Sequence, residues 1–460
     1  MSTPVSPSTQ RGFPEADVAD RPSWLNAMAR IVLLAGLVAA PWAYGAVLPW
    51  GWAGLAILAF VVLVFWALGC VQRGVLKVMW SPLYSPFLGF LLLAVVQFWG
   101  GFTYDHVATR ESVVKIATDL ALFFLAGQLL NTQPENTRSL RWLGLSAIVL
   151  ALSISALALV QFFTSPGAIY WRVTPPIGWP FGPYVNHNHY GGLMEMLIPI
   201  AATYLLSRRS RNPALYLVGG LLAFPIVSIL FSGSRGAVGV ILIEGVLLGL
   251  VVVAKSPKAV RGRAMLWGGV VAVVAVAVFL GLNSGHVTRR MMTMVQPDQY
   301  VRGEVGDRLG LARTALCMVV HHPVTGVGIG CFEYAFPGYA TFTSTMHWTH
   351  VHDDYLEALA EAGLPAALLL LAALWMFFRR GFRHLEERLR HESGWIQVGA
   401  TVACVGIMCH SFLDFNLRVA ANSAWFVVCL AVAVHSRSGS TSHRSAHRAS
   451  REERVEFTVQ

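Results

Sequence analysis

The stretch Met346-His-Trp-Thr-His-Val-His-Asp-Asp-Tyr-Leu-Glu-Ala-Leu-Ala-Glu-Ala-Gly-Leu364 joins the densest group of titratable side chains in the chain to a helical pattern. Asp353 and Asp354 are typical helix-capping and first-turn residues, and apolar side chains then repeat at helical spacing as far as Gly363. His352 is therefore expected just before the first turn of a helix. Because a helix N-terminus carries partial positive charge, it favours a neutral imidazole, which can accept a proton.

Two other interpretations of this stretch are open. Histidines in a loop can be polar surface side chains without a chemical role. Imidazole and carboxylate groups are also ordinary metal ligands, and four of them could hold an ion, those of His350, His352, Asp353 and Asp354. The stretch lacks the two histidines four residues apart that a zinc-binding helix provides. We therefore predict neither a metal ion nor another cofactor.

The composition indicates an integral membrane protein. Hydrophobic residues make up 55% of the 460 residues and charged residues only 13%, a balance that soluble globular proteins do not have. A helix of about 20 residues crosses a hydrocarbon core of about 30 Å. The predicted fold is all-α and polytopic, with about twelve transmembrane helices, at 27–46, 51–71, 83–100, 112–130, 142–163, 189–207, 213–231, 236–254, 264–283, 363–379, 395–413 and 418–436.

The distribution of basic residues predicts the orientation. If the N-terminus is cytoplasmic, most lysines and arginines fall in cytoplasmic segments, as the positive-inside rule requires. Both termini are then cytoplasmic, and the formal net charge of +10 needs no nucleic-acid partner. The predicted parts are a disordered cytoplasmic tail (1–22), transmembrane helices one to nine (23–283), a periplasmic loop domain with short helices (284–362), transmembrane helices ten to twelve (363–436) and a disordered basic cytoplasmic tail (437–460).

A group of amides and imidazoles stands where the predicted sixth span begins. It comprises Asn186, His187, Asn188 and His189 and follows a proline-rich outside loop. One interpretation is that these side chains cap the helix at the membrane interface. The other is that they contact a sugar or a phosphate, because amide side chains both donate and accept hydrogen bonds and so match hydroxyl groups.

The run Ser232-Gly-Ser-Arg-Gly236 separates the predicted seventh and eighth spans and leaves no room for an extended loop. Arg235 is therefore expected at or just below the outer membrane surface, where basic residues are scarce. An arginine at membrane depth costs at least about 2.5 to 3.5 kcal/mol on insertion scales, which favours a role as an anion receptor. A structural arginine whose head group reaches the interface is the alternative.

The predicted loop domain contains one clear helical pattern. Residues 307–320 place Arg308 at the beginning of a helix and form an apolar face of Leu309, Ala312, Leu316 and Val319. The glycine-rich segment 326–330 has no strand before it and opens no helix, so a turn is predicted rather than a nucleotide-binding loop. In the last outside turn, Asp414 and Arg418 are expected to form a buried pair.

The absence of a nucleotide-binding loop limits the chemistry. ATP is not available outside the cell membrane, so the energy for a reaction must come with the substrate. A lipid-anchored diphosphate meets this need, because its glycosyl bond is already activated and its anionic head lies at the interface. The guanidinium groups of Arg235 and Arg308 suit phosphate oxygens. His352 is then the general base for an incoming sugar hydroxyl, a role worth about 10²- to 10⁴-fold.

Three motifs together resemble the O-antigen ligase and O-antigen polymerase family of bacterial membrane glycosyltransferases: Ser232–Gly236, the segment from Arg308 to Phe332, and His350–Gly363. The resemblance implies an undecaprenyl-diphosphate-linked glycan donor and an acceptor glycan, either lipid A core or a lipid-linked glycan. It also implies a fold similar to other lipid-dependent (GT-C-like) glycosyltransferases, metal independence, and an inner-membrane location with the active site facing the periplasm.

The same resemblance assigns roles to single residues. It implies that Arg235 and Arg308 bind the diphosphate and that His352 is the catalytic histidine. Many members have Asn where this chain has Asp353. The other predicted substrate-binding residues are Asn186, His187, Asn188, His189, His350, Asp353 and Tyr355.

A membrane transporter of a polar or anionic solute is the alternative function, because about twelve spans with cytoplasmic termini also fit a carrier. A carrier would need ionisable residues at mid-membrane, and the spans contain few apart from Glu195 and Glu244. The sequence therefore favours the enzyme. It does not separate a ligase from a polymerase or from protein glycosylation, since these share the donor chemistry and differ in the acceptor.

Overall fold

The computed structural model describes residues 23–130, 136–176, 178–208, 213–256, 258–281, 299–342, 347–435 and 454–458. The predicted tail 1–22 lies outside these residues, as does most of the predicted tail 437–460. The helices are α1 (Trp24–Ala39), η1 (Ala40–Trp42), η2 (Tyr44–Ala46), α2 (Pro49–Arg73), α3 (Tyr84–Gly100), α4 (His106–Leu130), α5 (Asn136–Thr164), α6 (His187–Ser207), α7 (Pro213–Leu221), α8 (Ala223–Ser232), α9 (Arg235–Lys255), α10 (Lys258–Gly281), α12 (Gln299–His321), α13 (Phe332–Tyr339), α14 (Asp354–Gly381), α15 (Leu385–Arg388), α16 (Glu392–His410), η3 (Asn416–Arg418) and α17 (Ala420–Val434).

The helical membrane fold predicted from the sequence is confirmed. Among the described residues, eight helices are long and apolar enough to cross a membrane: α1 with η1, α2, α4, α5, α6, α9, α14 and α16. Shorter apolar helices are α3, the segment Leu217–Ser232 and α17. The predicted seventh segment is divided between α7 and α8, and the ninth falls on α10. The count of about twelve spans therefore stays a prediction.

Helices α6 and α16 pack against each other inside the bundle. In each of them, 83% of the most apolar stretch of the helix is buried inside the protein, whereas in α9 the buried share is 22%. They are also the least hydrophobic of the eight, with a mean hydropathy of 1.2, because a helix surrounded by protein need not present apolar side chains to lipid. Gly399 permits the close approach, since a Cβ there would lie 2.1 Å from Thr203 Oγ1. Polar side chains can therefore be held between these two helices.

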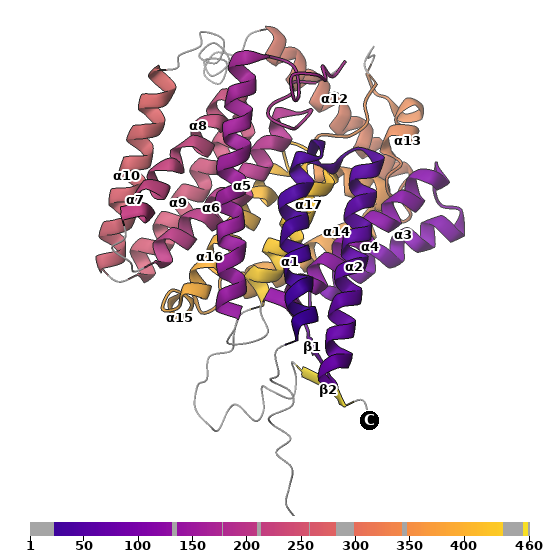
Figure 1. Cartoon of the computed structure of the whole chain (residues 1–460). Coiled ribbons are helices and arrows are strands. Elements are labelled where there is room, and N and C mark those ends of the chain that lie inside the picture. The colour runs from indigo at the N-terminus through magenta and orange to yellow at the C-terminus, as the bar shows by residue number, and fades with distance from the viewer. Residues whose placement is uncertain are drawn as a thin grey trace, which may run out of the picture.

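Helices α12 and α13 lie at one end of the helix bundle (Figure 1). The predicted loop helix is confirmed, but α12 begins at Gln299, so Arg308 lies within it and not at its beginning. The predicted apolar face is wrong: Leu309 and Leu316 are exposed, and the buried side chains of α12 include Leu311, Ala315 and Met318. Both sets have helical spacing, and contacts with α13 and α14 decide which one is buried.

The glycine-rich segment Gly326-Val-Gly-Ile-Gly330 forms a turn, as predicted, and its three glycines have positive φ. The side chain of Gln97 in α3 holds this turn. Its Nε2 donates to Thr325 O at 2.6 Å and its Oε1 accepts from Ile329 N at 3.0 Å. The turn is therefore attached to α3 through a buried amide.

Helix α14 crosses the predicted boundary between the loop domain and the tenth span. The interruption predicted at Gly363 is confirmed, because this residue has φ 67° and ψ −165°. A Cβ there would lie 2.7 Å from Pro323 O, so both the conformation and the space favour glycine. The helix then resumes and ends at Gly381. One kinked helix thus carries both the end of the loop domain and the following span.

Two short strands lie at the end of the bundle opposite α12 and α13 (Figure 1). β1 (Val75–Met79) pairs antiparallel with β2 (Arg454–Thr458), with Val75 opposite Thr458. The sequence analysis placed residues 454–458 in a disordered tail and did not predict this strand. The positions of the predicted loop domain and of the C-terminal tail relative to a membrane stay predictions.

Candidate active site

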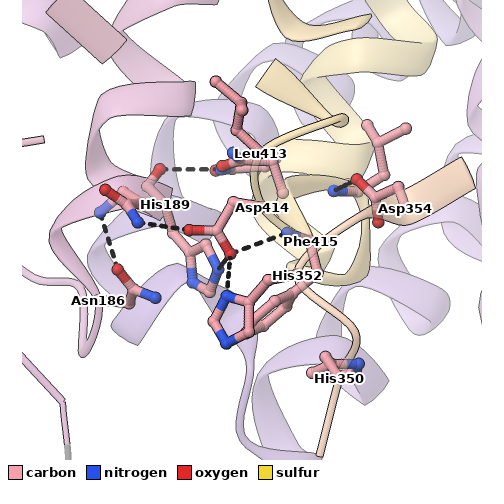
Figure 2. A network of polar contacts seen from close by, with 12 residues as sticks. Asn186, His189, His350, His352, Asp354, Leu413, Asp414 and Phe415 are labelled. Atoms are coloured by element: carbon pink, nitrogen blue, oxygen red, sulfur yellow. Dashed lines mark hydrogen bonds and ion pairs between the residues drawn. The ribbon is translucent and has the colours of Figure 1, made fainter. Parts of the chain in front are cut away.

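His352 immediately precedes helix α14, as predicted. The helix is capped by Asp353, whose Oδ1 accepts from the backbone N–H groups of Tyr355 at 3.0 Å and Leu356 at 2.9 Å. His352 itself has φ 62°, a left-handed conformation that costs a non-glycine residue about 1 to 2 kcal/mol. This conformation directs the imidazole of His352 away from α14 and toward the turn after α16 (Figure 2).

The partner of His352 is Asp414, which the sequence analysis assigned to a different pair. His352 Nδ1 lies 3.0 Å from Asp414 Oδ1, and the Asp414 side chain is fully buried. The same oxygen accepts from Phe415 N at 2.9 Å, and Asp414 Oδ2 accepts from Asn188 Nδ2 at 2.5 Å. The expected Asp414–Arg418 pair is wrong, because Arg418 binds two glutamates of α14 instead. No sequence spacing connects His352 and Asp414, which are 62 residues apart.

The turn that carries Asp414 is fixed on the first turn of α14. Asp354 N donates to Ser411 O at 2.8 Å, and Asp354 Oδ2 accepts from Ser411 Oγ at 2.9 Å and from Leu417 N at 3.2 Å. The aspartate pair that begins the helix thus has two tasks, since Asp353 caps α14 and Asp354 holds the turn. The only sequence signal for this turn was its polar character between two apolar segments.

The charge of Asp414 fixes the proton on His352. Burial opposes ionisation of Asp414, but the nearby imidazoles of His189 and His352 outweigh it and hold the pKa of this carboxyl well below its usual range. An ionised carboxylate only accepts hydrogen bonds, so Nδ1 of His352 carries a proton and donates it. In the neutral imidazole, Nε2 therefore has the free lone pair, which is the form that a general base requires.

The Asn186–His189 group has mixed roles in the structure. Asn186 Oδ1 accepts from Asn188 N at 2.8 Å and caps α6, so the capping interpretation holds for this residue. His189 is buried, with Nε2 at 3.8 Å from Asp414 Oδ1. His187 packs on Trp179 with a ring-centroid distance of 5.9 Å. Asn188 is the member of the group that joins Asp414 to α9, because its Oδ1 accepts from Ser234 Oγ at 2.7 Å.

Arg235 and Arg308 line one cavity of about 190 Å³, although 73 positions separate them in the chain. Arg235 is the first residue of α9, whose N-terminus is capped by Ser234. Arg308 projects from α12 and donates from Nη1 to Leu413 O at 2.6 Å. We call this the arginine cavity, and its described lining is His187, Asn188, Gly233, Arg235, Gly236, Arg308, His410 and Leu413.

A larger cavity of about 520 Å³ contains two other predicted substrate residues, His350 and Tyr355. Val47, Trp52 and Leu55 contribute to an apolar part of its lining. We call this the mixed cavity, because its described lining also contains the charged residues Glu111, Lys115, Asp119, Glu333, Asp354, Glu361 and Arg418.

Charged groups at the mixed cavity are paired with one another. His350 Nδ1 lies 2.8 Å from Glu357 Oε1, and burial would lower the pKa of His350, but the Glu357 carboxylate outweighs it and raises this pKa. Arg418 contacts Glu361 at 2.7 Å and Glu357 at 3.4 Å. Tyr355 donates its hydroxyl to Met408 O at 2.9 Å. These pairs offset part of the charge on the walls of the mixed cavity, whose described lining still contains more carboxylates than cations.

His352 connects the residues of the two cavities. Through Asp414 it is linked to Asn188 of the arginine cavity. Its ring also packs on Phe415, with a centroid distance of 4.9 Å, and Phe415 in turn contacts His350 of the mixed cavity, at 4.1 Å. A group held in either cavity would therefore lie close to the residues that position the imidazole of His352.

The described residues contain no group of three or more His, Cys, Asp or Glu side chains that could hold a metal ion. The four side chains considered as a ligand set have separate partners. His350 binds Glu357, His352 binds Asp414, Asp353 caps α14, and Asp354 binds Ser411. They do not converge on one point and do not form that set.

The fold and the two cavities define a helical membrane protein with a site at one end of its bundle, lined by arginine, asparagine and histidine. Residues 220–371 match the family model of the O-antigen ligase, and this match confirms the resemblance to the O-antigen ligase and polymerase family. It covers Arg235, Arg308 and His352 but neither Asn188 nor Asp414. No curated protein matches the chain. The family supports a function of the O-antigen ligase or polymerase type, with a lipid-linked glycan and an acceptor as substrates in general.

Proposed function

We propose that this protein is an inner-membrane glycosyltransferase that moves a glycan from undecaprenyl diphosphate to a hydroxyl group of an acceptor glycan. The observation that carries the proposal is the convergence of Arg235 and Arg308 on one cavity, together with the chain of hydrogen bonds from Asn188 through Asp414 to His352. Two guanidinium groups and a positioned imidazole are the groups that the reaction needs.

The arginine cavity is the proposed site of the diphosphate. No carboxylate occurs in its described lining, and two guanidinium groups do, so an anion there meets positive charge and no lining carboxylate that repels it. Guanidinium groups can bind phosphate oxygens in pairs, and each charge-assisted hydrogen bond contributes about 1.5 to 3 kcal/mol. Gly233 and Gly236 lack side chains that would keep a phosphate from the backbone at the start of α9. The isoprenoid tail of the donor would then lie in the bilayer beside α9.

His352 is the proposed general base. Its Nε2 takes the proton of the acceptor hydroxyl while the oxygen forms a bond to the anomeric carbon of the donor sugar. The bond between this carbon and the diphosphate oxygen breaks, and undecaprenyl diphosphate leaves as an anion. Asp414 stabilises the imidazolium that forms, because its carboxylate faces Nδ1 at 3.0 Å. Because the arginines neutralise the leaving group, the proposal requires no metal ion.

The mixed cavity is the proposed site of the acceptor glycan. Carboxylates, Lys115 and Arg418 on its walls offer both donors and acceptors to sugar hydroxyls, and its apolar part suits a lipid portion. Lipid A core and a second lipid-linked glycan both combine these features, so a ligase and a polymerase fit the cavity equally.

Deletion of the gene tests the proposed function most directly. Uncapped lipid A core together with long undecaprenyl-linked chains would identify a ligase, and surface polysaccharide reduced to single repeat units would identify a polymerase. Purified protein in proteoliposomes should also transfer glycan after exhaustive chelation of metals. Uptake of a polar or anionic solute without any glycan product would contradict the enzyme and support the transporter.

A further inference from the structure

His410 lies in the arginine cavity and has no part in the mechanism above. It is the last residue of α16, its side chain is 1% exposed, and it belongs to the cavity lining together with Arg235 and Arg308. Its Nδ1 lies 2.8 Å from Glu195 Oε1 of α6, and the Glu195 side chain is fully buried. A buried carboxylate requires a partner, and His410 is the partner of Glu195.

The second ring nitrogen of His410 is directed toward the beginning of α9. A Cβ at Gly236 would lie 2.8 Å from His410 Nε2, so the imidazole lies directly against the glycine that follows Arg235. Among the described residues, the structure gives this nitrogen no hydrogen-bond partner within the protein. The Glu195–His410 pair therefore presents one ring nitrogen to the cavity and keeps the other on a buried carboxylate.

The surroundings of His410 contain several carboxylates. Glu195 faces it from α6, and Asp354 of α14 and Asp414 of the following turn also lie near it. Glu244 of α9 lies near Glu195 and against Gly406 of α16. Glu244 is fully buried with no hydrogen-bond partner for either oxygen among the described residues, and Glu195 Oε2 is in the same state. The cations that face the cavity are Arg235 and Arg308.

We propose that His410, held by Glu195, is a third phosphate-binding group of the arginine cavity and donates a hydrogen bond from Nε2–H to the bound diphosphate. The inference rests on the proposed function, because it takes the diphosphate to occupy this cavity. When Glu195 holds one ring nitrogen, a proton on Nε2 makes His410 an imidazolium. The positive charge of this imidazolium balances the Glu195 carboxylate, so the pair as a whole is neutral. Its positive member is the one that faces the bound anion.

The test is the affinity of the purified full chain in nanodiscs for undecaprenyl diphosphate, measured between about pH 5 and pH 8, where histidine titrates. In the wild type, affinity should rise as the pH falls. His410→Gln keeps a hydrogen-bond donor but cannot become charged, so its affinity should be about tenfold lower at the acidic end. Because the diphosphate also titrates in this range, each variant is compared with the wild type at the same pH.

Two further variants separate the possible outcomes. Glu195→Gln should weaken binding at acidic pH less than His410→Gln does, because the imidazole remains but loses its carboxylate. His435→Gln is the control, since His435 is also buried but lies at the end of α17, where its Nδ1 contacts Ala431 O at 2.7 Å. This variant should bind as the wild type does.

The failure of this inference can be distinguished from the failure of the proposed function. If Arg235→Gln loses affinity while His410→Gln keeps wild-type affinity at every pH, the role of His410 is wrong and the site remains. If Arg235→Gln also binds as the wild type does, the diphosphate site itself is wrong. Should His410→Gln not fold, Gly236→Ala takes its place, because the added Cβ would displace the His410 ring. Unchanged affinity in Gly236→Ala would then contradict the inference.

Discussion

The arginine cavity and the mixed cavity differ in charge more than in any other property. The described lining of the first contains two arginines and no carboxylate, within about 190 Å³. The second, of about 520 Å³, contains five carboxylates, one lysine and one arginine. Carboxylates repel phosphate but bind sugar hydroxyls, and this difference is the reason for the proposal that the anionic end of the donor binds in one cavity and the acceptor in the other. His352 is linked to Asn188 of the first cavity through Asp414 and to His350 of the second through Phe415.

The largest effect is expected from the residue that connects the cavities. His352→Ala should reduce glycan transfer by about 10²- to 10⁴-fold, because the variant loses the proposed acceptor of the hydroxyl proton. Donor affinity should hardly change. The measurement is the rate of transfer in proteoliposomes. His347→Ala is the matched control, since His347 lies in the same stretch but is 69% exposed. Wild-type turnover in folded His352→Ala would refute the assignment of the base.

Asp414→Asn tests how His352 is positioned. The amide keeps the shape but presents no ionised acceptor to Nδ1, so the proton of His352 can move to Nε2. We expect a loss of turnover of about 10²-fold or more, little change in acceptor KM, and an altered pH profile. A merely structural role would affect protein yield and thermal stability but leave the pH profile of the folded enzyme as it was.

Arg235→Lys and Arg308→Lys test the arginine cavity. Lysine keeps the charge but not the planar fork, so donor affinity should fall about tenfold or more for each variant. The measurement is binding of undecaprenyl diphosphate. Arg313→Lys is a suitable control, because Arg313 lies on the same helix as Arg308 and is exposed. If all three variants bound undecaprenyl diphosphate with the same affinity, the proposal that the arginine cavity binds the diphosphate would be wrong.

Lys115→Gln tests the mixed cavity. Lys115 lies in its lining and near the ring of Trp52, at 5.2 Å. Removal of this charge should raise the KM for the acceptor by a factor of a few, since one hydrogen bond contributes about 1 kcal/mol, and should leave donor affinity unchanged. If Lys115→Gln instead changed donor affinity and left the acceptor KM unaltered, the proposed placement of the acceptor in the mixed cavity would be wrong.

The smallest effect concerns stability. The pKa of His350 is raised in the folded protein, so its pair with Glu357 stabilises the fold fully below the unfolded pKa of about 6.5. This contribution is lost as the pH rises through the higher folded pKa. Thermal unfolding of the wild type should therefore become easier from about pH 6.5 upward. His350→Gln should lack this step, and an identical pH dependence in both proteins would contradict the pairing.

The two cavities also show where prediction from sequence succeeded. Arg235, Arg308 and His352 were predicted as one site from local patterns, and the structure brings the two arginines into one cavity and links His352 to it. Asp414 was assigned to the wrong partner, although it links His352 to Asn188 in the lining of the arginine cavity. Local patterns report burial and helix ends, but a hydrogen bond between residues 62 positions apart has no periodicity.

The same limit explains the error in α12. Leu309 and Leu316 have the spacing of a buried face, yet Leu311, Ala315 and Met318 are the buried side chains. An amphipathic pattern identifies a helix, whereas the elements that pack on it decide which of two apolar faces is covered.

The sequence by itself determined a helical membrane protein, the cap that begins α14 and the turn at Gly326–Gly330, because hydrophobicity, capping and positive φ are properties of neighbouring residues. Only the tertiary structure decided the pairing of His352 with Asp414, the separation of His350 from the arginine cavity, and the position of His410 beside Gly236. Those contacts depend on how α6, α14 and α16 pack, and packing is a property of the whole chain.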